Sequence, residues 1–505
     1  MSARFLRGGL LLVAAGTAAL AAPAAAQGYR ASLDLRAQSV AFRGWELDSV
    51  PEGDVIVGPG GGPASPDGIA ATCPGVGGQC YFYRPGERQE SAPIVFTTDV
   101  TAWGFGLKGL SARANVRMIA NAGDTPWPAT QPGVQLWEGY LDYQHKWFGL
   151  RGGRQIITSR LGWTGFDGGM GTLRHQKLGL EATGYVGWGL SRSSPVGVNN
   201  PLNVPLGDFV PPLRHRVSGA ILGLHSGPVD LRGEWQRETD RATGFLINER
   251  VAGSGTVRIL RNLSATGGIE YLLAQDNFGS ADASLRWASA RVQATAGYRR
   301  YFPRFDLYSV WPAFSPVAWN GPVASINVLP LRWLQLRGRA EYLRFEETDT
   351  PSPLLLVRTD GWRGSVGGTV TAVRNFTFDA GWNVERIVGA WVQGFDGSVG
   401  WTPMPALALR AYGAYAQRPL EYRFNASTAT WFGLDVDARA TDRFNVGLSV
   451  VQINEERFRP DNAAFDWNQT RVSARATWYI ASNEQDRGQL PKAIRRMPSS
   501  IGYQK

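Results

Sequence analysis

Apolar and polar side chains alternate along the stretch from Leu136 to Leu190. Near its start, Leu141 and Tyr143 alternate with Asp142 and Gln144. The alternation returns later with the apolar series Leu178, Leu180, Ala182, Gly184, Val186 and Trp188. A period of two is typical of a β-strand with one apolar and one polar face. Because the pattern continues to about residue 480 without a convincing helix, the sequence predicts an all-β fold.

The length of the apolar runs decides what kind of all-β fold this is. Only helices and closed barrels cross a bilayer, and no stretch after the N-terminal segment offers 18 uninterrupted apolar residues. The chain has 62 glycines and 11% aromatic residues, yet its mean hydropathy is −0.20. In a barrel with a water-filled lumen, the apolar outward and polar inward side chains together give a mean hydropathy near zero. We therefore expect a transmembrane antiparallel up-and-down β-barrel, and the alternative is a large secreted β-sandwich or propeller.

The connections between the expected strands alternate in length. Short turns such as Lys146-Trp147 and Arg374-Asn375 are followed by longer connections, for example 157–165 and 191–212. A separate strand from Phe166 to His175 keeps this alternation intact and gives about 22 strands, within a range of 18–22. Outer-membrane barrels have short periplasmic turns and longer external loops, so both ends of the barrel domain are expected on the periplasmic side.

The domain boundaries follow from composition. Residues 1–26 carry two arginines before an apolar run and end in alanines, which is typical of a secretory signal peptide. The barrel is expected over 27–480, with a Gly/Pro-rich external loop at 49–91, and a polar, basic periplasmic tail over 481–505. These features predict a location in the cell outer membrane.

The only two cysteines, Cys73 and Cys80, lie in the expected external loop. In an oxidising compartment such a pair is typical of a disulfide, which here would close a small ring and stabilise it by about 2 to 3 kcal/mol. A redox or metal-binding role is the alternative reading of this pair.

Charged residues sit on the polar faces of the expected strands. A charge facing lipid near the midplane costs about 2 to 4 kcal/mol, so these residues are assigned to the lumen. Arginines there can form a conduit for anionic or polyhydroxylated solutes, or pair with acids on neighbouring strands and stiffen the wall. The expected pore-lining residues are Arg113, Arg117, Glu138, Asp142, Arg151, Arg154, Asp167, Arg232, Arg337, Arg339, Asp435, Asp437, Arg471 and Arg475.

Other classes of function find little support in the sequence. The formal net charge of +10 comes mostly from arginines interleaved with acids, which disfavours nucleic acid as a partner. Only four histidines occur, and no hydrolase, phosphate-binding or metalloprotease motif accompanies them. We expect neither an enzyme, nor a metal site, nor a cofactor.

Three short motifs carry a family resemblance. The chain reads WEGYLDY at 137–143, LRGGRQ at 150–155 and GFDG at 165–168. This series resembles the alginate-export-like porins of Gram-negative outer membranes. The resemblance implies a monomeric barrel with a partly Arg-lined pore and, in some members, export of an anionic polysaccharide. It implies pore-wall positions for Arg151, Arg154, Gln155 and Asp167, although a bulge at Gly152-Gly153 would change which of them face inward.

Together these patterns predict a porin-like channel for passive passage of small hydrophilic, preferentially anionic solutes. One alternative is an exporter of an anionic exopolysaccharide. Another is a barrel blocked by its 49–91 loop that serves as a surface adhesin or anchor. The expected partners are outer-membrane lipid and lipopolysaccharide, the outer-membrane assembly machinery, and small anionic or polyhydroxylated solutes.

Overall fold

The computed structural model describes most of the chain. The described residues are 28–58, 61–75, 78–125, 133–190, 215–302, 318–346, 359–387, 390–417, 427–458 and 466–482. The expected signal peptide (1–26), the external connection at 191–212 and nearly all of the expected tail (481–505) lie outside them.

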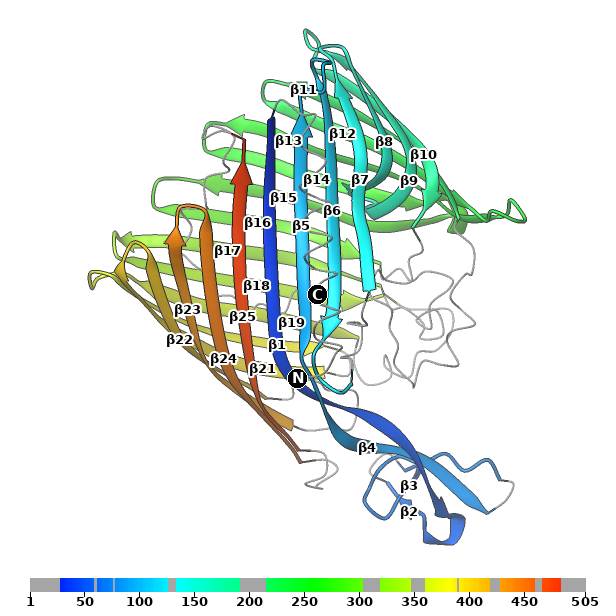
Figure 1. The fold of residues 1–505 in the computed structure, drawn as a ribbon. Coiled ribbons are helices and arrows are strands. Elements are labelled where there is room, and N and C mark those ends of the chain that lie inside the picture. Colours follow the sequence, from blue (N-terminus) through cyan, green and yellow to red (C-terminus); the bar gives the residue numbers. More distant parts are fainter. Residues whose placement is uncertain are drawn as a thin grey trace.

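Twenty-two antiparallel strands form a closed barrel (Figure 1). The barrel closes because β1 pairs with β25 on one side and with β5 on the other. The strands are β1 (Gly28–Pro51), β5 (Pro93–Trp103), β6 (Leu110–Asn121), β7 (Gly133–Gln144), β8 (Phe148–Ser159), β9 (Gly162–His175), β10 (Leu180–Gly189), β11 (Arg216–Ser226), β12 (Val229–Thr239), β13 (Leu246–Leu260), β14 (Leu263–Leu272), β15 (Asn277–Ala288), β16 (Val292–Tyr301), β17 (Trp319–Leu331), β18 (Leu334–Phe345), β19 (Asp360–Val370), β20 (Phe376–Ile387), β21 (Ala390–Met404), β22 (Leu407–Gln417), β23 (Ser427–Thr441), β24 (Phe444–Arg457) and β25 (Trp467–Ala481).

The expected barrel of about 22 strands is confirmed. Among the described residues the only helices are two short 3₁₀ turns, Glu52–Asp54 and Leu273–Gln275. No helix in this part of the chain is long and apolar enough to span a membrane.

The two faces of the wall follow the sequence alternation. On β10, for example, Val186 and Trp188 are exposed on the outside, whereas Thr183 and Tyr185, at positions of the opposite parity, are buried on the inside. Many large apolar side chains are exposed in the described part of the chain, and in a membrane barrel the hydrocarbon of the bilayer covers such outward side chains. The face pattern is therefore that of a membrane-spanning wall.

One expected external connection is wrong. The sequence pattern predicts a longer loop at 157–165, but β8 runs to Ser159 and β9 begins at Gly162, so only Arg160 and Leu161 connect them. Gly162 takes a φ of +108°, which an L side chain rarely adopts, and this allows the tight turn. The alternating sequence at 162–165 continues the strand instead of interrupting it.

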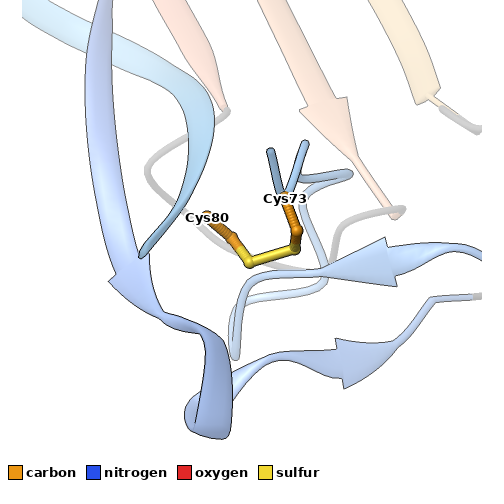
Figure 2. The surroundings of a disulfide bond; sticks show 2 residues. All are labelled: Cys73 and Cys80. Carbon is orange, nitrogen blue, oxygen red and sulfur yellow. A yellow bond between two sulfur atoms is a disulfide. The ribbon is translucent and has the colours of Figure 1, made fainter. Parts of the chain in front are cut away.

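The segment 49–91 is an arm and not a simple loop. The second half of β1 pairs with β4 (Gln79–Ser91), and this ribbon projects beyond the end of the barrel (Figure 1). Its tip carries the small pair β2 (Ile56–Val57) and β3 (Pro63–Ala64). Cys73 and Cys80 are joined in a disulfide beside this tip (Figure 2). Val50 and Phe82 pack on the buried Cys80, so the arm has a small core of its own.

Candidate functional site

The β8–β9 hairpin leaves the barrel wall. β7 and β8 are paired only from Gly139↔Arg154 to Gln144↔Gly149, whereas β8 stays paired with β9 as far as Ser159↔Gly162. The outer part of β7 therefore loses its neighbour on this side. The last residues of β8 and the first residues of β9 form a hairpin that is not paired with β7 and can bend away from the wall.

Contacts at the hairpin tip show where it goes. The carbonyl oxygen of Leu161 accepts a hydrogen bond from Arg250 Nη1 on β13 at 2.6 Å. The Leu161 amide donates to Glu234 Oε2 on β12 at 3.3 Å. Arg160 Nη2 donates to Asp282 Oδ1 on β15 at 2.6 Å. These strands lie several positions further round the barrel, so the hairpin reaches them by folding into the lumen.

The hairpin rests on an apolar seat inside the barrel. Phe166 of β9 and Val217 of β11 have no exposed surface, and they form a buried cluster with Tyr185 of β10. The Phe166 and Tyr185 rings stack with centroids 5.4 Å apart, and Ile157 of β8 packs on the same cluster. Burying each large apolar side chain contributes about 1.5 to 3 kcal/mol. The lumen, expected to be wet throughout, thus has an apolar patch where the hairpin docks.

A buried polar network surrounds this seat. Arg250 is only 2% exposed and lies 3.8 Å from a carboxylate oxygen of Glu238 and 3.5 Å from one of Glu270. Gln236 donates to Glu238 at 2.6 Å and accepts a hydrogen bond from Thr164 of β9 at 3.2 Å. Arg250 and Gln236 therefore each have one hydrogen-bond partner on the docked hairpin, the Leu161 carbonyl oxygen and the Thr164 hydroxyl respectively.

A cluster of arginines occupies the wall next to the hairpin tip. Arg299 of β16, Arg339 of β18 and Arg363 of β19 all contact the carboxylate of Glu341, whose side chain is fully buried. Arg363 Nε lies 2.7 Å and Arg339 Nη2 3.4 Å from Glu341 Oε2. Three guanidinium groups thus converge on one buried carboxylate, and Arg363 is also in register with Glu385 across the β19–β20 pair. We call this group the arginine cluster.

The hairpin tip and the arginine cluster are continuous. Asp282, which binds Arg160 of the tip, is in register with Arg299 across the β15–β16 pair. Arg299 and Arg363 also stack over the Trp319 ring, at 4.9 and 5.6 Å from its centroid. The folded-in hairpin and the cationic wall therefore border the same part of the lumen.

Most of the expected pore-lining residues lie on the inner face and are paired with carboxylates or polar groups. The pairs are Arg113 with Asp99 and Glu138, Arg151 with Asp142, Arg232 with Glu234, Arg337 with Asp379, Arg339 with Glu341, Arg475 with Asp34, and Asp435 with Ser449. Asp437 follows Asp435 on the same face of β23, and Arg471 precedes Arg475 on β25. Arg117 lies over the Trp137 ring at 5.6 Å.

Arg154 and Asp167 are placed differently from Arg151. They are opposite each other in the β8–β9 register and form a double hydrogen bond of 2.7 and 2.9 Å. They lie on the strand face opposite to Arg151, and Arg154 Nη1 donates to the Leu136 carbonyl oxygen of β7 at 2.9 Å. Gly153 beside them has a φ of +130°. The Arg154–Asp167 pair therefore links β7, β8 and β9 at the point where the hairpin separates from β7. Gln155, the fourth residue of the family-like motif, is fully buried in the hairpin.

Sequence reasoning did not single out Arg250, Arg299 or Arg363. Each fits the alternation, but nothing local distinguishes it from the other inward arginines. Their importance comes from partners on other strands, and these depend on strand register and on the hairpin's path. Among the described residues, no group of three or more metal-binding side chains gathers in one place.

Comparisons with known proteins leave the family open. No model of a known protein family matches this chain, and no curated protein matches it. Solved structures of similar shape include the siderophore receptor PirA from Pseudomonas aeruginosa, with 9% identity and a TM-score of 0.49 over 90% of this chain and 80% of that chain. OccAB1 of Acinetobacter baumannii matches with 8% identity and a TM-score of 0.37 over 91% of this chain and 99% of that chain. Likeness at this level carries no argument about function.

Proposed function

We propose that this protein is a channel of the bacterial outer membrane through which small hydrophilic solutes, preferentially anions, diffuse. The closed wall with apolar side chains outside and charged side chains inside supports the membrane location, because only a barrel satisfies its backbone in lipid in this way. The protein acts as a passage and not as an enzyme.

The observation that carries the anionic preference is the arginine cluster. Arg339 is 51% exposed although its carboxylate partner is fully buried, so the positive charge faces the lumen while the negative charge does not. Guanidinium groups present paired N–H donors to carboxylates and phosphates. A lumen wall with this potential concentrates anions and repels cations.

The β8–β9 hairpin supports small solutes as the cargo. It is held inside the lumen by the Arg250 and Glu234 contacts to Leu161 and therefore reduces the free cross-section. The motif residues that resemble alginate-export-like porins lie in this hairpin and in β7, which keeps export of an anionic exopolysaccharide as the second candidate. A blocked barrel finds less support, because the described part of 49–91 projects away from the barrel (Figure 1).

Single-channel recording in planar bilayers tests this function. The purified protein should give discrete conductance steps, and its reversal potential in a salt gradient should show a higher permeability for chloride than for potassium. Absence of current at every salt concentration would overturn the channel. Cation selectivity would overturn the anionic preference. Loss of a secreted polymer on gene deletion would favour the exporter.

A further inference from the structure

Cations are concentrated at one end of the barrel. Ten short turns join the strands at the end where β1 begins and β25 finishes. Eight of these turns carry one basic residue each, and the only acid among the ten turns is Asp442. The eight cations are Lys108, Lys146, Lys177, Arg261, Arg291, Arg332, Arg374 and Arg443. In outer-membrane barrels the end with short turns faces the periplasm. We call this set the periplasmic cation ring.

These cations are available to an outside partner. All eight are exposed, and none makes an ion pair with another residue in the described part of the chain. This differs from the lumen, where the arginines of the wall are tied to carboxylates. Internal pairing therefore does not account for the ring.

Large apolar side chains stand beside the ring cations and show what surrounds them. Trp147 follows Lys146, and Trp333 follows Arg332. Both indoles are more than 40% exposed, and the Lys146 ammonium lies 5.4 Å from the Trp147 ring centroid. Exposed apolar neighbours of other ring cations are Leu107, Leu178, Leu260 and Val373. Amphipathic tryptophan side chains such as Trp147 and Trp333 mark the boundary between acyl chains and headgroups. The adjacent cations then lie at the depth of the lipid phosphates.

The arm at the opposite end of the molecule has the reverse charge. In the arm, acids outnumber arginines, with Glu46, Asp48, Glu52, Asp54, Asp67, Glu87 and Glu90 against Arg43, Arg84 and Arg88. The excess of basic residues in the periplasmic cation ring therefore does not extend to the arm.

We propose that the periplasmic cation ring binds the headgroups of anionic phospholipids in the inner leaflet of the outer membrane. The ring cations supply the charge, and the neighbouring tryptophan and leucine side chains contact the acyl chains. A basic residue at an anionic membrane surface strengthens binding by a factor of about five, so even one contact per lipid gives a measurable preference. This inference depends on the barrel lying in the outer membrane and not on its transport activity.

Native mass spectrometry of the detergent-solubilised protein tests the proposal. The protein is titrated with phosphatidylglycerol and, separately, with phosphatidylcholine of the same acyl chains. The wild type should bind phosphatidylglycerol at least about five-fold more tightly. The variant Lys108→Gln, Lys146→Gln, Arg332→Gln and Arg374→Gln should lose most of this preference.

A matched variant separates the ring from net charge. Arg84→Gln, Arg241→Gln, Arg344→Gln and Arg386→Gln remove four exposed cations from the other end of the molecule and should leave the preference unchanged. Circular dichroism confirms that both variants keep their β-sheet, and Lys108→Arg with Lys146→Arg should retain binding. Equal losses in the two charge-neutralised variants, or no preference in the wild type, would overturn the proposal. Displacement of the lipid by soluble glycerol phosphate would assign the ring to free phosphate compounds and overturn the lipid assignment.

Discussion

Two charge clusters in the lumen are built in opposite ways. At the hairpin seat one arginine, Arg250, stands between the carboxylates of Glu238 and Glu270, and all three are buried. In the arginine cluster one carboxylate, Glu341, is buried among three arginines that keep 26 to 51% of their side-chain surface exposed. The charges of the first cluster are buried beneath the hairpin, and Arg250 holds the hairpin in place. The second leaves its three arginines partly exposed to the lumen, and in the proposed channel these arginines contact the solute.

This difference predicts different responses to mutation. Removal of one member of a buried ion pair leaves an uncompensated charge and costs about 3 to 5 kcal/mol. Removal of one member of a half-exposed pair costs about 0 to 1 kcal/mol, because water replaces the lost partner. Substitutions at the hairpin seat should therefore lower the free energy of unfolding, and substitutions in the arginine cluster should change ion selectivity.

The largest expected effect is that of Arg250→Ala. It removes the donor to the Leu161 carbonyl and leaves Glu238 and Glu270 without their shared cation. We expect the free energy of unfolding, measured by denaturant titration in lipid vesicles, to fall by about 3 to 5 kcal/mol. Arg258→Ala, an exposed position on the same strand, is the control and should change it little. An equal loss of stability in Arg250→Ala and Arg258→Ala would contradict the structural role of the buried Arg250 network.

The next effect is that of Phe166→Ala at the apolar seat. The fully buried ring stacks on Tyr185, and its loss creates a cavity under the hairpin. We expect a loss of about 3 kcal/mol in the free energy of unfolding, at the low end for buried phenylalanine because lumen water can enter the space. Trp163→Ala on the same strand, where the indole is 51% exposed, should cost much less. A larger loss at Trp163 would mean that the hairpin docks through its other face.

At the arginine cluster, Arg339→Gln should leave stability within about 1 kcal/mol of the wild type. Glu341 keeps its contacts with Arg299 and Arg363. The chloride-to-potassium permeability ratio, obtained from the reversal potential, should move toward one because a lumen charge is lost. Arg344→Gln removes an equal charge from the opposite face of β18 and should not change the ratio. An unchanged ratio in Arg339→Gln would contradict the role of the cluster.

How much of this could be read from the sequence depends on whether a feature is local. Alternation such as that at Leu141 to Gln144 predicts the wall, because each strand side chain faces lipid or lumen according to its own position. The alternation of short turns and longer connections predicts the strand count. The path of the hairpin depends on Arg160 and Leu161 meeting strands more than 70 residues away. No periodicity encodes such contacts, and the alternating residues of β8 look like those of any other strand. The Arg299–Glu341 contact likewise depends on register across three strands.

The smallest effect is expected for the double substitution Cys73→Ser and Cys80→Ser. The disulfide and its small core lie in the arm, outside the barrel (Figure 2). The arm should lose protease resistance, since a disulfide of this loop size stabilises by about 2 to 3 kcal/mol. Conductance and selectivity should stay as in the wild type. A change in either would show that the arm takes part in conduction together with the hairpin and the cluster.

In the proposed channel, the β8–β9 hairpin sets the width of the passage. The most direct test is the single-channel conductance of a variant in which residues 156–165 are replaced by two glycines, with β-sheet circular dichroism showing that the barrel still forms. We predict a conductance clearly higher than that of the wild type and passage of larger neutral sugars in a liposome-swelling assay. A folded variant with the conductance and size limit of the wild type would contradict the claim.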